Sequence, residues 1–372
     1  MIHFAAPAGS DWTLREYLSR WGHAVAKRFR LIPYEDLLQA GSFEPGAYVL
    51  SSLCSIPDHM RRSLERLHAS LCREAGFRFL NHPTKTLTRL PLLEELSRRG
   101  LNGFRAARAT NGFGHLRFPV FLRSERTHDG ALSPLLHSRS AVEASIGRAL
   151  VRGRPLRDLL VVEFCDTSDT NGYFRKYSAY VVGDRVLPRS LEYGRPWVLK
   201  HEHCEFSQAQ LAEERAYVLA NPHEKQLSRI FAIAGVEYGR IDYAVKDGQV
   251  QTWEINLHPT IGRGRVATKS HVPPALEPFR EESKAFFYRA FQSAWETIDP
   301  SEQPPRAVSL SLPTEPEPRA SSRQGTSTLA RVRRRAPRPL RHLALALTTP
   351  LLPAIGRLAL RRARQRPDAR VV

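Results

Sequence analysis

The stretch that decides the fold lies at residues 238–256 and reads YGRIDYAVKDGQVQTWEIN. Two runs rich in β-branched and aromatic residues flank the dipeptide Asp247-Gly248, a pattern that predicts a β-hairpin. Successive side chains of a strand point to opposite faces of a sheet, and in both runs apolar residues alternate with polar ones. Each predicted strand therefore has one apolar face for the core and one face that carries charge.

The register of this hairpin decides whether its two charged faces coincide. Arg240 and Asp242 share one face of the first strand, and Glu254 and Asn256 share one face of the second. A two-residue turn with regular pairing would set Asp242 opposite Trp253 and send the carboxylates to opposite sides of the sheet. A three-residue loop, or an equivalent bulge, pairs Asp242 with Glu254 and Arg240 with Asn256. We therefore predict the odd loop or a bulge, with the glycine of the turn in the left-handed conformation.

This register would gather four polar side chains in one patch, with three oxygen donors beside a guanidinium. Carboxylate and amide oxygens are ligands that Mg²⁺ accepts, and the ion keeps room in its shell for water and phosphate oxygens. The alternative is an ordinary hairpin with a solvated charged face. Asn256 weighs against that alternative, because asparagine is disfavoured in strands and here lies between apolar residues. The pattern therefore favours a site for Mg²⁺ and polyphosphate.

The hairpin resembles the metal-binding hairpin of the ATP-grasp superfamily, which includes D-alanine–D-alanine ligases, glutathione synthetases and ribosomal-protein glutamate ligases. The segments that carry the resemblance are Gly239–Asp242, Asp247-Gly248 and Trp253–Pro259. The resemblance implies that Asp242, Glu254 and Asn256 hold Mg²⁺, as two ions, against the phosphates of ATP. It also implies that Arg240 contacts phosphate as the catalytic residue.

Other segments fit the same family in its order along the chain. Leu159–Cys165 resembles the strand whose backbone reads adenine, and Arg123 ends a strand that resembles the one before the phosphate-side loop, here Ser124–Gly130. The family usually has lysine at that position and a glycine-rich loop, whereas this chain has arginine and one glycine. Lys176 either faces the nucleotide or lies on a strand whose charged side chains face the solvent. The residues assigned to nucleotide binding are Lys85, Arg123, Glu163, Phe164, Cys165, Asp166 and Lys176.

Short strand-like runs alternate with helical patterns in the first part of the chain, which predicts a parallel α/β domain. This part lacks both the G-x-G-x-x-G fingerprint and the P-loop pattern. The resemblance covers about residues 80–262. We therefore expect an α/β protein with α+β subdomains. A parallel α/β domain over 1–100 would precede an ATP-grasp fold over 101–300, with its nucleotide cleft near 160–170 and a disordered basic tail over 301–372.

The resemblance implies a ligase that depends on Mg²⁺ and ATP. A substrate carboxylate would become an acyl phosphate, and an amine or thiol would then displace the phosphate. Two alternatives stay open at this point. One is a kinase of the same fold that phosphorylates a small molecule, and the other is a non-enzymatic nucleotide-binding protein docked through its basic tail.

Two residues are candidates for contact with the substrate, a small molecule or peptide that bears a carboxylate. His258 lies between Asn256 and Pro259, where the acceptor substrate should approach. Arg195, close to Trp197, has the charge to bind an acidic group.

Charge is concentrated towards the end of the sequence. The whole chain has 56 Lys and Arg against 37 Asp and Glu, a formal charge of +19. Residues 301–372 hold 15 arginines, no lysine, 4 acidic residues and 10 prolines, which predicts a mostly disordered tail. An alternative is a helix over Ala354–Arg366 that lies on an anionic membrane. Non-specific nucleic-acid binding is the third alternative, placed last because no aromatic residues interleave with the arginines, and no specific nucleic-acid partner is expected.

The remaining sequence features bear on the cellular compartment in which the protein is found. The first residues lack a basic region followed by an apolar stretch, and the four cysteines have no CxxC spacing. These features predict a cytoplasmic protein. If the tail forms the membrane-bound helix named above as an alternative, the protein would also be peripheral to a membrane. Leu343–Leu360 is apolar, but Pro350, Pro353 and Arg357 argue against a spanning helix.

Overall fold

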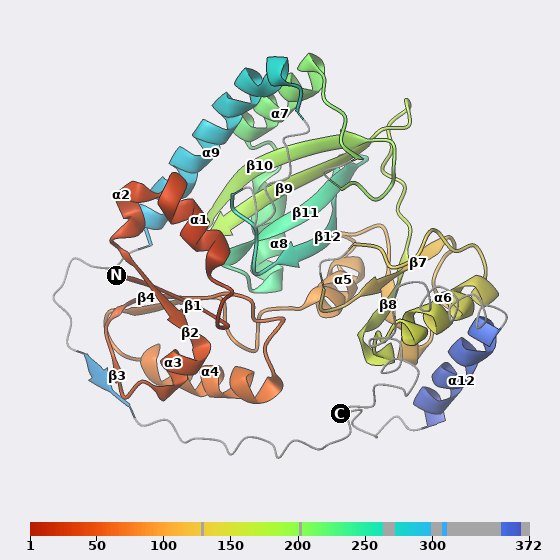
Figure 1. Ribbon diagram of the computed structural model, residues 1–372, viewed down its shortest axis with the longest axis horizontal. Coiled ribbons are helices and arrows are strands. Elements are labelled where there is room, and N and C mark those ends of the chain that lie inside the picture. Colours follow the sequence, from red (N-terminus) through yellow and green to blue (C-terminus); the bar gives the residue numbers. More distant parts are fainter. Residues whose placement is uncertain (128–129, 201–202, 263–271, 299–306, 311–350, 366–372) are drawn as a thin grey trace, which may run out of the picture. The chain divides into compact units, whose positions relative to one another are not determined.

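The computed structural model describes residues 1–127, 130–200, 203–262, 272–298, 307–310 and 351–365. The chain divides into two compact units (Figure 1). The first unit comprises Met1–Thr88 and Thr167–Glu315, and the second comprises Arg89–Asp166 and Pro316–Val372. This division differs from the expected one at residue 100. Helix α5 belongs to the second unit because its first residue, Arg89, is buried and donates from its guanidinium to the backbone carbonyls of Ser124 and Thr127.

The first unit begins with a parallel sheet of strand order β2-β1-β4-β5. Its strands are β1 (Ile2–Ala6), β2 (Phe29–Pro33), β4 (Gly46–Leu50) and β5 (Phe77–Leu80). Its helices are α1 (Trp12–Arg20), α2 (His23–Ala26), α3 (Tyr34–Gln39) and α4 (Asp58–Leu71). The alternation of strands and helices confirms the predicted parallel α/β arrangement.

The second part of the first unit is an antiparallel sheet of order β10-β9-β11-β12. Its strands are β9 (Phe174–Val182), β10 (Arg185–Gly194), β11 (Tyr238–Lys246) and β12 (Gln249–Asn256). Its helices are α7 (Gln208–Ala220), α8 (Glu224–Ala234) and α9 (Glu277–Glu296). One apolar core joins both sheets of the unit, since Phe4 of β1, Tyr238 of β11 and Trp295 of α9 are all buried in it.

The second unit contains a three-stranded antiparallel sheet of order β6-β8-β7. Its elements are α5 (Arg89–Arg98), β6 (Ala106–Arg108), β7 (Val120–Ser124), α6 (Arg139–Val151), β8 (Leu159–Glu163) and α12 (Leu352–Gln365). Val142 and Ile146 of α6 pack on Leu122 of β7 and Val161 of β8 to form a separate core.

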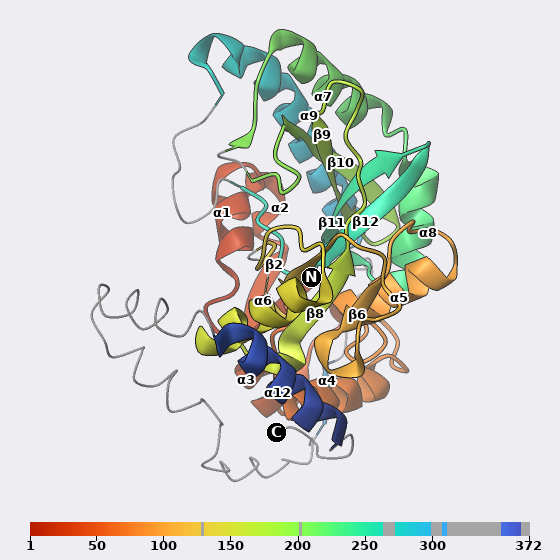
Figure 2. The same ribbon diagram turned by 90° about the vertical axis from the view of Figure 1, so that its right-hand side faces the viewer.

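Two stretches of the tail that we expected to be disordered are ordered. Strand β13 (Val308–Ser309) pairs with β3 (Ser42–Phe43), and helix α12 packs on α6 (Figures 1 and 2). The helix forms because Leu352, Gly356 and Leu360 recur at four-residue spacing and give it one face that can be buried. Residues 311–350 and 366–372 lie outside the described residues. In the part of the chain that the structure describes, no helix is long and apolar enough to cross a membrane.

Two helices differ from their expected bounds. The capping box formed by Thr13 and Glu16 and the pattern that follows it predict a single helix over 13–27. This prediction is wrong, because α1 ends at Arg20, and Gly22, whose amide donates to the Tyr17 carbonyl, separates it from α2. The sequence pattern over 85–99 predicts a helix that begins at Lys85, which is also wrong, since α5 begins at Arg89. Lys85 lies in a turn and Thr86 in a bend, and the amide of Leu87 donates to the carbonyl of Ala234.

His3 on β1 makes the stability of the first unit sensitive to acid. Its ring is 1% exposed and stacks on Tyr48 with ring centroids 4.4 Å apart. Burial lowers its pKa from 6.5 to about 4. The unfolded chain therefore binds the proton first, and stability should fall by about 3 kcal/mol as the pH drops from 6.5 to 4. Equilibrium unfolding of the His3→Leu variant should lose this part of the pH dependence.

The control for this prediction is His115→Leu, which replaces an exposed histidine by the same residue. We expect the free energy of unfolding of this variant to depend on pH in the same way as that of the native chain. An equal pH dependence in the native chain and the His3→Leu variant would contradict the prediction.

Candidate functional site

The hairpin of β11 and β12 brings the two predicted carboxylates together by means of a β-bulge. The turn has two residues, Asp247 and Gly248, with φ values of 51° and 75°. Asp242 pairs with Glu254, whereas Tyr243 already pairs with Thr252, so that Trp253 is the extra residue. The prediction of an odd loop or an equivalent bulge is thus confirmed, in the form of the bulge. The left-handed glycine in the turn is confirmed as well.

The charged face of the hairpin continues onto β9 and β10. In β9, Ser178 pairs with Asp242 and Tyr180 pairs with Arg240. Lys176, two residues before Ser178, lies on the same face and pairs with Glu192 of β10. Residues paired across antiparallel strands share a face, so one side of this sheet carries a row of polar and charged side chains that reaches all four strands.

Arg240 and Asp242 form a two-pronged ion pair within β11. The Nε and Nη2 atoms of Arg240 lie 2.7 and 3.0 Å from the two carboxylate oxygens of Asp242. The side chains are 24% and 10% exposed. Burial lowers the pKa of Arg240, but the negative charge of Asp242 outweighs this and leaves the pKa above its usual value. The guanidinium therefore keeps its charge in this largely buried position.

Lys176 and Glu192 form a second ion pair on the same face, with Nζ and Oε2 2.6 Å apart. Burial lowers the pKa of Lys176, but Glu192 and then Asp242 raise it, and the net pKa lies above its usual value. Glu192 was missed from the sequence. Regular pairing from the turn at Gly183 would have set Leu191 opposite Lys176, and a bulge between Pro188 and Ser190 shifts the register by one residue.

The donor set of the hairpin suits a hard cation. Asp242, Glu254 and Asn256 are 7%, 8% and 8% exposed. The Oδ1 atom of Asn256 accepts from the amide of His258 at 2.7 Å, which orients the side-chain amide. Among the described residues, no three His, Cys, Asp or Glu side chains gather as a metal site. Two carboxylates and one amide would leave places in the shell of Mg²⁺ for water or phosphate oxygens.

The remaining nucleotide candidates near residue 160 lie in the second unit. Glu163, at the end of β8, is 1% exposed, and its carboxylate accepts from the amides and guanidinium groups of Arg105 and Arg117. Burial raises the pKa of Glu163, but these hydrogen bonds outweigh it and leave the pKa lowered. The side chain of Glu163 therefore holds neighbouring segments of the unit together, and its backbone amide donates to the carbonyl of Arg105. The amide of Phe164 donates to the carbonyl of Pro119.

Cys165 and Asp166 follow β8 as the last residues before the chain passes into the first unit. Cys165 is half-buried and Asp166 is exposed. Arg123 lies on β7 opposite Leu160. Lys85 belongs to the first unit and is exposed in a turn, where its backbone amide donates to Nδ1 of His82.

The two substrate candidates are placed differently. The ring of His258 lies edge-on to Trp12 at 6.1 Å between centroids, and its Nε2 atom is 2.5 Å from the carbonyl oxygen of Ser10. His258 is thus fixed beside Asn256. The guanidinium of Arg195 stacks on the ring of Tyr173 at 4.4 Å from its centroid.

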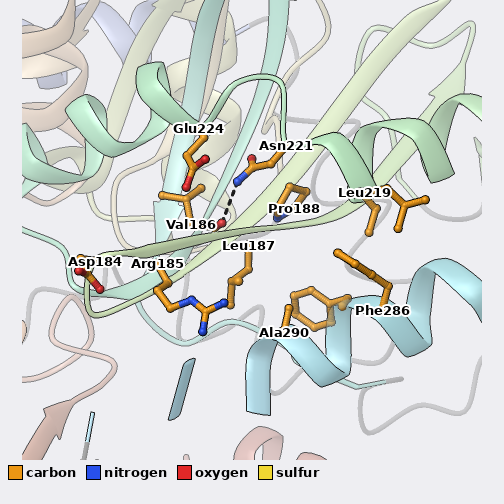
Figure 3. A pocket seen from close by; sticks show the side chains of 12 residues that line it. Asp184, Arg185, Val186, Leu187, Pro188, Leu219, Asn221, Glu224, Phe286 and Ala290 are labelled. Carbon is orange, nitrogen blue, oxygen red and sulfur yellow. Dashed lines mark hydrogen bonds between the residues drawn. The ribbon is translucent and has the colours of Figure 1, made fainter. Parts of the chain in front are cut away.

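A hollow of about 390 Å³ lies on the other hairpin of the first unit, along the edge strand β10 (Figure 3). Leu187 and Phe287 line it on the apolar side, and Asn221 donates from its side chain to the carbonyl of Val186 at 3.0 Å. None of the carboxylates of the β11–β12 hairpin lines this hollow. The polar row described above and this hollow, which both polar and apolar side chains line, are therefore separate features.

Comparisons with protein-family models and with curated proteins find no match to this chain. Among solved structures, the chain is similar to D-alanine–D-alanine ligase from Bacillus anthracis complexed with ATP, with 11% identity over 80% of this chain and 98% of that chain, at a TM-score of 0.42. It is also similar to a RimK domain protein ATP-grasp from Sphaerobacter thermophilus, with 13% identity over 77% and 98% of the two chains, at a TM-score of 0.42.

A third similar structure is the ATP-grasp ligase PsnB complexed with minimal precursor. It has 14% identity over 75% of this chain and 99% of that chain, at a TM-score of 0.41. Two of the three are named as ATP-grasp proteins. At these TM-scores the similarity carries no argument about function. Any assignment of chemistry must therefore rest on the residues of this chain.

Proposed function

We propose that this protein is an ATP-grasp enzyme that uses Mg²⁺ and ATP to activate a carboxylate for attack by an amine or a similar nucleophile. The observation that supports this proposal best is the pairing of Asp242 with Glu254 beside the pair of Arg240 and Asn256. Two carboxylates opposite each other in a mostly buried position repel one another unless cations lie beside them. Arg240 and Lys176 supply part of that positive charge, and Mg²⁺ would supply the rest.

In this proposal the candidate residues of the first unit divide the work between the metal, the phosphates and the substrate. Asp242, Glu254 and Asn256 would hold Mg²⁺, which neutralises negative charge on the phosphates. Arg240 would stabilise the charge that develops on the transferred phosphoryl group, and Lys176 would bind phosphate oxygens. His258 and Arg195 would contact the substrate.

The other candidate residues would bind the rest of the nucleotide. The backbone of Glu163, Phe164 and Cys165 would read adenine, with Asp166 next to the ribose. Arg123 and Lys85 would contact the phosphates.

The reaction has two steps. A carboxylate oxygen of the substrate attacks the γ-phosphorus, and ADP leaves to give an acyl phosphate. The amine nitrogen then attacks the acyl carbon, loses a proton, and inorganic phosphate leaves. A kinase would instead leave the phosphate on its product, so stoichiometric phosphate release on adding an amine distinguishes the two chemistries.

Thermal unfolding of the full chain with and without Mg·ATP tests the nucleotide site. At a ligand concentration about 100 times its dissociation constant, the native state should gain about 2.7 kcal/mol. The gain should depend on Mg²⁺, because the carboxylates would otherwise face the phosphates directly. A folded native chain that shows no shift with Mg·ATP would exclude the proposed site.

A further inference from the structure

Helix α12 has two opposite faces, of which one is buried against α6 (Figure 2). Leu352 and Leu360 are 1% and 4% exposed, and Gly356 lies between them on the same face. A Cβ atom at Gly356 would overlap the carbonyl oxygen of Glu143 on α6, so the two backbones are in direct contact. This close packing fixes which face of α12 points away from α6.

An ion pair adds to this fixed orientation. The Nη1 atom of Arg357 lies 3.3 Å from the carboxylate of Glu143, which is 6% exposed. Gly147 of α6 contributes from the other side, because a Cβ atom there would overlap the carbonyl oxygen of Leu352. These contacts hold α12 in one orientation on α6, so the face opposite α6 is also fixed in its orientation.

The outward face carries the two most exposed large apolar side chains of the described residues. They are Leu351, 58% exposed, and Leu358, 53% exposed. Leu351 directly precedes the first residue of α12 and lies seven residues before Leu358. Seven residues are close to two helical turns, so both leucines lie near the same side. Arg361 and Arg362 are exposed and follow Leu358 by three and four residues, which places them one turn further along that side. The helix contains four arginines and no acidic residue.

We propose that this outward face, formed by Leu351, Leu358, Arg361 and Arg362, docks on a lipid bilayer that contains anionic lipids. Leucine side chains can enter the boundary between headgroups and acyl chains while the flanking guanidinium groups bind lipid phosphates. Nucleic acid would use the arginines but leave both leucines in water, and no aromatic residue in the helix is available to stack on bases. The combination of apolar and basic side chains therefore favours a membrane surface.

Co-sedimentation of the full chain with vesicles tests this surface. We expect binding to vesicles of phosphatidylcholine mixed with phosphatidylglycerol and little binding to phosphatidylcholine alone. Arg361→Glu combined with Arg362→Glu should weaken partitioning by roughly thirtyfold or more, since each arginine near an anionic surface contributes about fivefold. Leu351→Ser combined with Leu358→Ser should weaken it by about tenfold, through loss of apolar burial.

The matched control is Lys225→Glu combined with Arg229→Glu on α8, which changes the net charge equally at exposed positions. It should bind vesicles nearly as the native chain does. Equal losses in the two charge variants, or full binding by the leucine variant, would overturn the proposal. Binding of the native chain to duplex DNA, but not to the vesicles, would also overturn it and make α12 a nucleic-acid contact.

Discussion

Glu254→Gln is expected to slow ATP-dependent phosphate release by about 10²–10³-fold. The substitution keeps the shape of the side chain but removes one charge from the pair that Glu254 forms with Asp242. The site would then hold Mg²⁺ and the phosphates less tightly in the transition state. Phosphate release should be measured with the carboxylate and amine that the native chain accepts. The stabilisation by Mg·ATP should fall in parallel.

Asp247→Asn is the matched control, because it removes one carboxylate from the same hairpin at an exposed position in the turn. Asn-Gly is as well suited to this turn as Asp-Gly, so the hairpin should keep its register. We expect native activity from this variant. If both variants lost activity equally, the effect would come from the charge or folding of the hairpin, and the assignment of Glu254 would be wrong.

Arg240→Met is expected to lower the free energy of unfolding by about 3 kcal/mol, since it leaves the carboxylate of Asp242 largely buried without its guanidinium. Asp242 is 7% exposed and Glu254 is 8% exposed, so water can screen their repulsion only weakly. Added Mg²⁺ should restore part of this stability, because the ion would replace the lost positive charge between the strands. Urea unfolding with and without Mg²⁺ measures both effects.

Arg215→Met provides a control with the same kind of ion pair at the surface. Arg215 contacts Glu282 through two bonds of 2.7 Å, but the side chains are 47% and 56% exposed. Its loss should change stability little, and Mg²⁺ should not affect the variant. An Arg240→Met variant as stable as the Arg215→Met variant would show that the carboxylates of the hairpin need no cation beside them.

The elements that the sequence predicts well are those with local signals. Gly183 and Gly248 mark the two hairpins. The sequence also predicts a strand over 2–6 and a helix over 224–234, which are the bounds of β1 and α8. Strand β2 was missed, because its residues 29–33 follow arginine-rich sequence without a turn signal. Helix α12 was assigned to a disordered tail, with a helix over 354–366 as the alternative, because the proline and arginine content around it is typical of disorder. Its few apolar residues become buried only through contact with α6, which the sequence does not reveal.

The sequence alone determines which residues are candidates for the site. Whether their side chains lie next to one another was decided by the tertiary structure. Asp242 and Glu254 can be read as candidates from their places in two alternating strands, yet a slip of one residue sends them to opposite faces. The bulge at Trp253 sets that register, and a second bulge at Arg189 brings Glu192 to Lys176. Bulges depend on how a strand packs against its neighbours and on the layers that cover it, and no local pattern encodes those contacts.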